Sequence, residues 1–169
     1  MDENILYFAY GSNLHPERLR ARIPSSRFIC ICPVAGYQLR FHKRGEDLSG
    51  KCNAVFTGIK EHFVLGAVFN MKQAEKALLD NIEGEGYCHE PVDVKLGKQF
   101  KEAFMYVAEE PFIDDSLNPF QWYKDFVQLG AQYHRFPDQY LQTITAIEAI
   151  DDHDEARHRS NESVLALMR

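Results

Sequence analysis

The fold is decided by Ile5-Leu6-Tyr7-Phe8-Ala9-Tyr10-Gly11-Ser12-Asn13-Leu14, an apolar run that stops abruptly at small and polar residues. The pattern predicts a buried strand followed by a turn that exposes the backbone N–H groups of residues 11–13. Gly11 can adopt a positive φ or let a ligand approach the backbone closely. A helix is expected next, because Pro16 suits its first position and Asn13 or His15 can cap it. A strand, a turn and a helix start in this order can hold an anion or an oxyanion.

Hydrophobic periodicity predicts strands in the first two thirds of the chain and helices in the last third. The expected strands cover residues 28–34, 37–41, 53–59, 64–70, 92–96 and 100–107. Residues 53–59 and 64–70 are expected to form a hairpin, and the last two strands to pair across Gly97-Lys98. Residues 43–51 and 109–118 are expected to form loops. Strands followed by helices favour an α+β fold.

The expected helices begin at polar caps and end at a glycine or before a proline. One starts between Asn70 and Gln73 and stops at Gly84, one runs from Asn118 to about Arg135, and one covers residues 140–147. Residues 151–161 are charged and are expected to be loose, with residues 164–168 docked or frayed. The predicted organisation is one domain over residues 1–150 and a charged C-terminal tail over residues 151–169, docked in part.

The chain carries a net charge of −6, which argues against a nucleic-acid backbone or an anionic membrane surface as partner. Its apolar runs are only as long as strands, so no segment is expected to span a bilayer. The first four residues, Met1-Asp2-Glu3-Asn4, are acidic and unlike a secretory signal. The sequence therefore predicts a cytoplasmic protein without nucleic-acid or membrane partners.

The four cysteines are Cys30, Cys32, Cys52 and Cys88, and their spacing gives no Cys-x-x-Cys pair and no Cys/His quartet. A structural zinc site is therefore not expected, and a reducing compartment suits these thiols better than disulfides do. Only two of the seven histidines, His153 and His158, are near neighbours, and their spacing suits a metal ion poorly. The sequence predicts neither a metal site nor an organic cofactor.

Three segments carry a more specific signal than spacing alone. The first is the loop from Tyr7 to Leu14. The second is Ala77-Leu78-Leu79-Asp80-Asn81-Ile82-Glu83-Gly84, with Gly86-Tyr87 and Glu90-Pro91-Val92-Asp93-Val94; the third is Tyr123-Lys124-Asp125-Phe126-Val127, with Gly130-Ala131, Phe136-Pro137 and Tyr140. In this order, and over most of residues 5–150, they resemble the γ-glutamylcyclotransferase (AIG2-like) family. The resemblance implies an α+β fold, with a small mixed β-barrel and helices packed outside it, and often a homodimer.

The resemblance also implies an enzyme that converts γ-glutamyl amino acids or dipeptides to 5-oxoproline and a free amino acid. In this reaction the α-amine of the γ-glutamyl group attacks its own γ-carbonyl, so the small-molecule substrate supplies the nucleophile. The enzyme supplies a general acid/base, a cradle for the oxyanion and a pocket, and it needs no cofactor. The resemblance assigns catalysis to Glu83 and substrate binding to Tyr7, Tyr10, Gly11, Ser12, Asn13, Leu14 and Tyr123.

The position of Glu83 at the end of a predicted helix fits this role. The partial negative charge of the helix C-terminus and partial burial near Tyr87 both raise the pKa of a carboxyl group. The simpler alternative is that Glu83 is a solvated residue before a glycine cap. Glu85 is a rival carboxylate, but it lies between two glycines, where a side chain is poorly held. Tyr123 has a simpler alternative as well, which is packing on one face of its helix.

Two other functions remain open, a γ-glutamylamine cyclotransferase and a non-catalytic member of the fold that binds a small ligand. Loss of the carboxylate would favour the second, and Glu83 is present. Two loops are expected to select the leaving group, and their charged residues are Lys43, Arg44 and Lys51 in one, and Glu109, Glu110, Asp114 and Asp115 in the other. The loop sequence Gly-Ser-Asn, where glutathione-degrading relatives have Gly-Ser-Leu, disfavours free glutathione.

Overall fold

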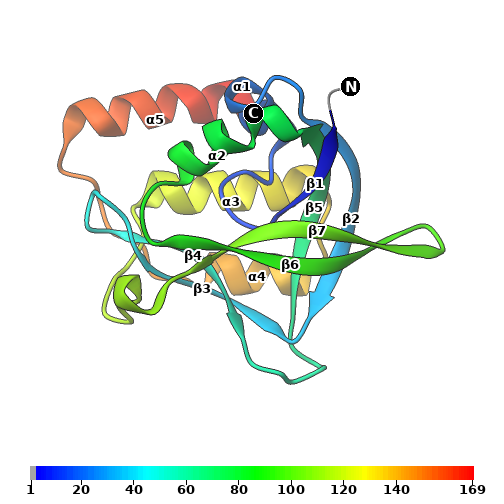
Figure 1. The fold of residues 1–169 in the computed structure, drawn as a ribbon. Coiled ribbons are helices and arrows are strands. Elements are labelled where there is room, and N and C mark those ends of the chain that lie inside the picture. Colours follow the sequence, from blue (N-terminus) through cyan, green and yellow to red (C-terminus); the bar gives the residue numbers. More distant parts are fainter. Residues whose placement is uncertain (1–2) are drawn as a thin grey trace.

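The apolar run at the start of the chain forms β1 (Asn4–Ala9), the central strand of a five-stranded sheet (Figure 1). The computed structural model describes residues 3–169, so Met1 and Asp2, which belong to the acidic start of the chain, lie outside the described residues. The strand order is β2-β5-β1-β7-β6. The other four strands are β2 (Arg27–Ala35), β5 (Phe63–Lys72), β6 (Tyr87–Leu96) and β7 (Gln99–Ala108).

The sheet is mixed and strongly curled. β1 is antiparallel to β5 and parallel to β7, and the remaining neighbours are antiparallel. The two edge strands β2 and β6 approach each other, and Cys30 Sγ lies 3.9 Å from the carbonyl oxygen of Lys95. A second sheet of β3 (Tyr37–Arg44) and β4 (Gly50–Phe56) packs against β5 and β7. The expected α+β fold, a small mixed barrel with helices outside, is confirmed.

The expected hairpin between residues 53–59 and 64–70 is wrong. Both segments are strands, but β4 pairs with β3, whereas β5 pairs with β1 and β2. Between them the chain passes from one sheet to the other around Gly36, whose carbonyl oxygen accepts from Thr57 N and whose N–H donates to the carbonyl oxygen of His62. The hairpin of β6 and β7 forms as expected, across Gly97-Lys98.

Two short helices carry the residues that matter most for the site. In α1 (Pro16–Arg22) the cap is His15, whose Nδ1 accepts from Glu17 N at 3.2 Å. The helix α2 (Lys76–Glu83) follows a 3₁₀ turn, η1 (Gln73–Glu75), so it begins later than expected. It ends at Gly84, whose φ of +75° is a conformation that glycine adopts without strain. The last residue of α2 is therefore Glu83.

The C-terminal part of the chain is more ordered than its charge suggests. After a second 3₁₀ turn, η2 (Glu110–Phe112), come α3 (Gln121–Tyr133), α4 (Asp138–Thr145) and α5 (Glu155–Met168). The segment expected to be loose thus lies largely in α5, which packs against α3 and α1. In Figure 1, α5 (red) runs along the top of the molecule. Its N-cap is Asp154, and Leu165 and Met168 are buried.

Within the described residues, no helix combines the length and apolarity needed to cross a membrane.

Candidate active site

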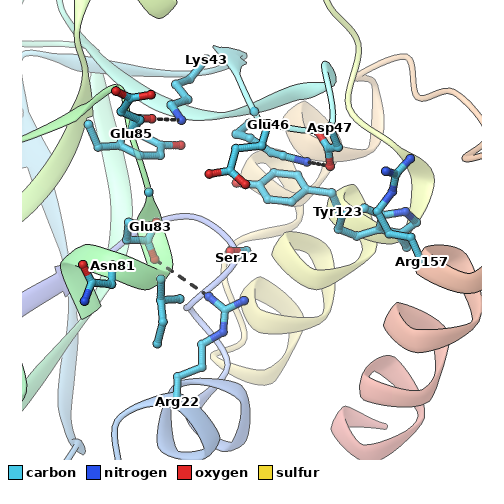
Figure 2. A pocket seen from close by; sticks show the side chains of 16 residues that line it. Ser12, Arg22, Lys43, Glu46, Asp47, Asn81, Glu83, Glu85, Tyr123 and Arg157 are labelled. Atoms are coloured by element: carbon cyan, nitrogen blue, oxygen red, sulfur yellow. Dashed lines mark hydrogen bonds and ion pairs between the residues drawn. The ribbon is translucent and has the colours of Figure 1, made fainter. Parts of the chain in front are cut away.

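A pocket of about 560 Å³ opens where the turn after β1, the end of α2 and the turn between β3 and β4 come together (Figure 2). We call it the wide pocket, and it is lined among others by Ser12, Arg22, Lys43, Lys51, Glu83, Tyr87, Trp122, Tyr123 and Arg157. A narrow recess of about 20 Å³ adjoins it, because the two cavities share Ser12, Glu83, Tyr87 and Tyr123. This tyrosine recess is lined by Tyr7, Tyr10, Gly11, Ser12, Asn13, Cys52, Glu83, Tyr87, Tyr106 and Tyr123.

The carboxylate of Glu83 lies at the junction of the two cavities. Its side chain is only 16% exposed, because α2 ends against the turn that follows β1. Glu83 Oε1 accepts a 2.6 Å hydrogen bond from Asn13 Nδ2 and lies 4.0 Å from a guanidinium nitrogen of Arg22. Burial raises the pKa of Glu83, and the positive charge of Arg22 and the Asn13 hydrogen bond counteract only part of that rise.

The amide of Asn13 is held in one orientation. A guanidinium can only donate, so the 3.1 Å contact between Arg22 and Asn13 identifies the oxygen of the amide. The amide NH₂ group therefore faces the other way, where it donates to Glu83 and, at 3.2 Å, to the hydroxyl of Tyr7. Asn13 thus acts through its side chain and fixes the position of the Glu83 carboxylate.

The turn after β1 presents backbone donors at the recess. Leu14 N donates to the carbonyl oxygen of Gly11 at 3.1 Å and closes the turn. In residues 3–169 the N–H groups of Gly11, Ser12 and Asn13 donate to no protein acceptor. Leu14 is fully buried and packs so closely against Gly130 that a Cβ there would lie 2.5 Å from Leu14 Cβ. Leu14 therefore anchors the turn in the core, while residues 11–13 face the ligand space.

Glycine is required at position 11 because of a close contact. A Cβ on Gly11 would lie 2.9 Å from Cys52 Cβ, closer than such atoms come in proteins. Its φ is not in the left-handed region, so conformational freedom is not the reason. The thiol of Cys52 is itself buried at the recess, and burial raises its pKa to about 12. A thiol of this kind stays protonated at neutral pH and is a poor nucleophile.

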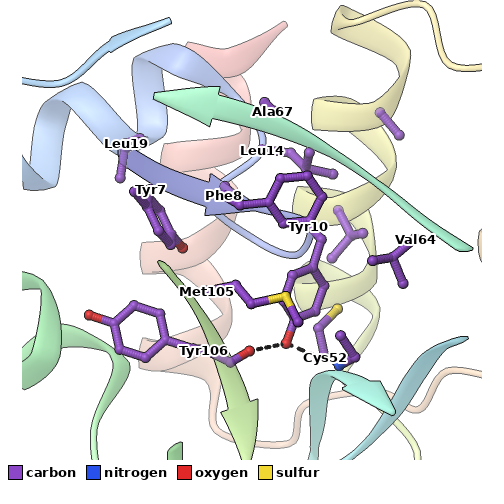
Figure 3. Close-up of a cluster of buried hydrophobic side chains, with 14 of the residues drawn as sticks. Tyr7, Phe8, Tyr10, Leu14, Leu19, Cys52, Val64, Ala67, Met105 and Tyr106 are labelled. Atoms are coloured by element: carbon purple, nitrogen blue, oxygen red, sulfur yellow. Dashed lines mark hydrogen bonds between the residues drawn. The ribbon is translucent and has the colours of Figure 1, made fainter. Parts of the chain in front are cut away.

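Four of the five recess tyrosines fall into two groups, and the fifth, Tyr106, donates its hydroxyl proton to Asp80 Oδ1 at 2.5 Å. Tyr10 donates to the carbonyl oxygen of Tyr106 and accepts from Ala54 N, so its hydroxyl ties β1 to β7 and β4 (Figure 3). Tyr87 donates to the carbonyl oxygen of Cys52 at 2.6 Å. These hydroxyl protons are used within the protein, so Tyr10 and Tyr87 contribute mainly their rings to the recess.

Tyr7 and Tyr123 form the second group, whose hydroxyl protons have no strong acceptor within the described residues; Tyr123 interacts with the Cys52 thiol, which is a weak acceptor. The hydroxyl of Tyr7 accepts from Asn13, and that of Tyr123 accepts from Cys52 N at 3.0 Å. Burial raises the pKa of both phenols, so each stays protonated at neutral pH. Each hydroxyl can therefore donate its own proton into the recess. The expected site residues other than Leu14 are thus brought together around one space.

Two cations that line the wide pocket, Arg22 and Arg157, were not predicted from the sequence, whereas Lys43 and Lys51 were expected in a loop that selects the leaving group. Arg18 and Arg22 lie one turn apart on α1, and burial over the ring of Phe126 lowers the pKa of Arg18 to about 9. Their spacing of four residues was the available signal, because it places both on one helix face. Of the two loops expected to select the leaving group, residues 43–51 line the wide pocket, whereas within the described chain residues 109–118 do not. The described residues contain no group of three or more His, Cys, Asp or Glu side chains suited to a metal ion.

Comparisons with known proteins agree with this geometry. A sequence model of a protein family described as "Gamma-glutamyl cyclotransferase, AIG2-like" matches residues 7–125. The gamma-glutamylcyclotransferase of Homo sapiens is 29% identical over 155 residues, which cover 89% of this chain and 82% of the relative. That of Bos taurus is 29% identical over 154 residues, which cover 88% of this chain and 81% of the relative. A solved structure named "Gamma-glutamyl cyclotransferase" has a TM-score of 0.81 at 25% identity, covering 98% of this chain and 99% of that chain.

Proposed function

Because the chain belongs to the gamma-glutamyl cyclotransferase, AIG2-like family, we propose that it converts γ-glutamyl amino acids or dipeptides to 5-oxoproline and a free amino acid or peptide. The human and bovine relatives are named gamma-glutamylcyclotransferase, and the chain matches them over most of their length. The chain is therefore an enzyme of the cyclotransferase type. The choice of γ-glutamyl substrate and the roles of the individual residues are the content of the proposal.

In the proposed reaction Glu83 moves one proton. Its carboxylate takes a proton from the α-ammonium group of the substrate, and the free amine attacks the γ-carbonyl carbon of the same molecule. The new C–N bond closes the five-membered ring. The bond to the leaving nitrogen then breaks as Glu83 returns the proton to it, which regenerates the carboxylate. The ring nitrogen still carries two protons after the attack, and it gives one of them up to the released amine, which leaves as an ammonium group. A raised pKa suits a group that both accepts and donates a proton near neutral pH.

The turn after β1 and the tyrosines hold the substrate in this proposal. The N–H groups of Gly11, Ser12 and Asn13 donate to the oxygen of the attacked carbonyl, where negative charge develops. The hydroxyls of Tyr7 and Tyr123 donate to polar groups of the γ-glutamyl chain, and the ring of Tyr10 forms a wall of the recess. Holding the chain folded favours ring closure, because the two reacting groups belong to one molecule.

One observation carries the proposal, the fixed carboxylate of Glu83 beside unpaired backbone donors. Glu83 is favoured over Glu85, which is exposed and accepts from Lys43 Nζ at 2.6 Å through its carbonyl oxygen rather than its carboxylate. The test is incubation of the protein with a panel of γ-glutamyl amino acids, γ-glutamyl dipeptides and γ-glutamylamines, scored by release of 5-oxoproline. Release that is lost in Glu83→Gln supports the proposal. No release from any compound of the panel would leave a ligand-binding protein with the enzyme fold.

A further inference from the structure

Lys43 lies in the wide pocket but has no role in the proposed reaction. It lies near the end of β3, lines the wide pocket and is 3% exposed. Its ammonium donates to the carbonyl oxygen of Glu85 at 2.6 Å and lies 4.5 Å from the centre of the Tyr87 ring. An ammonium has three donors, so two remain for another acceptor.

The other cations of the wide pocket already have anionic or polar partners. Lys51 pairs with Asp47 at 2.7 Å. Arg157 donates two hydrogen bonds to the carboxylate of Asp152, of 2.7 Å and 2.5 Å. Arg22 is bound to the amide oxygen of Asn13 and lies near Glu83.

Lys43 differs from these cations. Within residues 3–169 no carboxylate oxygen lies within 4.0 Å of its ammonium. Burial lowers the pKa of Lys43, and the attraction of carboxylates beyond 4.0 Å, that of Glu83 foremost, opposes this lowering. A buried charge without a counter-ion is unfavourable, so an anionic group of the substrate would complete this part of the pocket.

The two cavities indicate which part of the substrate lies near Lys43. The unpaired backbone donors and the hydroxyl of Tyr7 face the narrow recess, which is where the γ-glutamyl chain is held in the proposed function. Glu83 lies at the junction, so the bond that breaks lies there too. The leaving group then extends into the wide pocket. Lys43 lines this pocket and does not line the recess. Figure 2 shows Lys43 and Arg22 on opposite sides of Glu83.

We propose that Lys43 is a specificity-determining residue, whose ammonium binds the carboxylate of the leaving amino acid and so favours γ-glutamyl amino acids over γ-glutamylamines. This inference rests on the proposed function, because it concerns the leaving group of that reaction. It separates two classes of substrate that the sequence left open. An amine leaving group has no carboxylate, so it leaves the buried ammonium of Lys43 without a counter-ion.

The test uses two substrates that differ only in this carboxylate, γ-glutamyl-alanine and γ-glutamyl-ethylamine. The value of kcat/KM is measured for both with the unmodified protein and with Lys43→Met, which keeps an unbranched side chain one atom shorter and removes its charge. For each substrate, the kcat/KM of the variant is divided by that of the unmodified protein. Comparing these two ratios cancels the different intrinsic reactivity of the two amides. The matched control is Lys101→Met, the same change at an exposed residue of β7 outside the pocket.

The expected result is that Lys43→Met lowers kcat/KM for γ-glutamyl-alanine about 10- to 100-fold more than for γ-glutamyl-ethylamine, the range for loss of a hydrogen bond to a charged group. The control should leave both values unchanged. An equal fall for both substrates overturns the proposal, because Lys43 would then hold the Glu85 segment or the γ-glutamyl group itself, while the proposed function stands. Absence of 5-oxoproline from either substrate with the unmodified protein overturns the proposed function instead. If Lys43→Met does not fold, Lys43→Gln, which keeps a neutral donor, is judged by the same two ratios.

Discussion

Asn13 Nδ2 donates a 2.6 Å hydrogen bond to Glu83 Oε1, so the turn after the first strand positions a carboxylate that is 70 residues away in sequence. The same turn presents the unpaired N–H groups of residues 11–13. A proton carrier and a set of oxyanion donors are therefore fixed relative to each other by one short segment. This coupling makes the site sensitive to small changes on either side of the bond.

The first prediction concerns Glu83→Gln. The change preserves shape and hydrogen-bonding capacity but removes the ability to accept a proton from the substrate ammonium. We expect 5-oxoproline release to fall about 100- to 10,000-fold, the usual contribution of a positioned general base. The melting temperature should change little, because Gln has the same size and its amide oxygen can still accept the hydrogen bond from Asn13.

Glu85→Gln is the matched control for this change, since it alters a carboxylate two residues away that is exposed. We expect it to keep most of the activity. Near-normal turnover by Glu83→Gln, together with loss in Glu85→Gln, would show that the proposal names the wrong carboxylate.

The second prediction concerns the pH dependence of the rate. Glu83 must be ionised to accept the proton, so the rate should rise with pH through the pKa of Glu83, which burial places above its ordinary value. Arg22 favours the ionised form. Arg22→Met should therefore raise the pKa of Glu83 further and move the acid limb of the kcat/KM profile to higher pH.

Arg20→Met is the control for this shift, because Arg20 lies on the same helix but is exposed and pairs with Glu17. It should leave the acid limb in place. The same profile for all three proteins would mean that the limb reports a group other than Glu83.

Features of the fold that depend on interactions between neighbours in the sequence could be predicted, and those that depend on contacts between distant segments could not. The strand at residues 4–9, the glycine end of α2 and the β6–β7 hairpin follow from local periodicity and turn chemistry, which the sequence shows directly. The pairing of β4 with β3 does not, because extended residues do not reveal which partner they hydrogen-bond. The helix α5 was missed because its order depends on tertiary contacts, such as that of Arg157 with Asp152, rather than on its own amphipathic pattern.

The candidate site divides in the same way. Glu83 and the 11–14 turn could be named because their motifs resemble a known family and because a helix end and a glycine turn have their own chemistry. Lys43 could be placed in a loop expected to select the leaving group, but its burial against Glu85 could not be predicted. The approach of Arg22 to Asn13 could not be predicted either, since both contacts depend on elements whose placement is set by the whole barrel. The division of the tyrosines into structural and available hydroxyls also needed coordinates. In the sequence, Tyr10 and Tyr123 both look like aromatic residues of a core. Only the hydrogen-bond partners of their hydroxyls show that the two have different roles.

The third prediction concerns the contact between Gly11 and Cys52. A methyl group at position 11 would lie 2.9 Å from Cys52 Cβ, so Gly11→Ala should displace the turn and its donors. We expect kcat/KM to fall about 10- to 100-fold, a common result when reacting groups move by a fraction of an ångström to one ångström. Ser12→Ala should stay close to normal activity, because the N–H of residue 12 remains. Adding Cys52→Gly to Gly11→Ala removes the obstructing atom and should restore part of the rate; failure to do so would place the defect elsewhere.

The last prediction concerns Asp152, which fastens α5 to the body of the protein. Its side chain is fully buried and accepts from Trp122 Nε1 at 2.9 Å and from the guanidinium of Arg157. Asp152→Ala leaves the indole N–H without a partner, whereas Arg157, which is 35% exposed, can turn to water. We expect a loss of about 1–3 kcal/mol in the free energy of unfolding, measured by urea denaturation at pH 7. Asp151→Ala, an exposed neighbour, should change it by less than about 0.5 kcal/mol.

The pH dependence of this loss has a defined sign. The guanidinium of Arg157 holds the pKa of Asp152 well below its ordinary value, so the unfolded chain takes up the proton first as the pH falls. The contribution of Asp152 to stability is therefore complete above the unfolded pKa of about 3.9 and is lost as the pH falls towards the folded value. The gap between the unmodified protein and Asp152→Ala should be constant from pH 7 to pH 5 and narrow below pH 4. A gap that stays equally wide at pH 3 would show that Asp152 stabilises α5 by shape rather than by its charge, because protonation would then remove nothing.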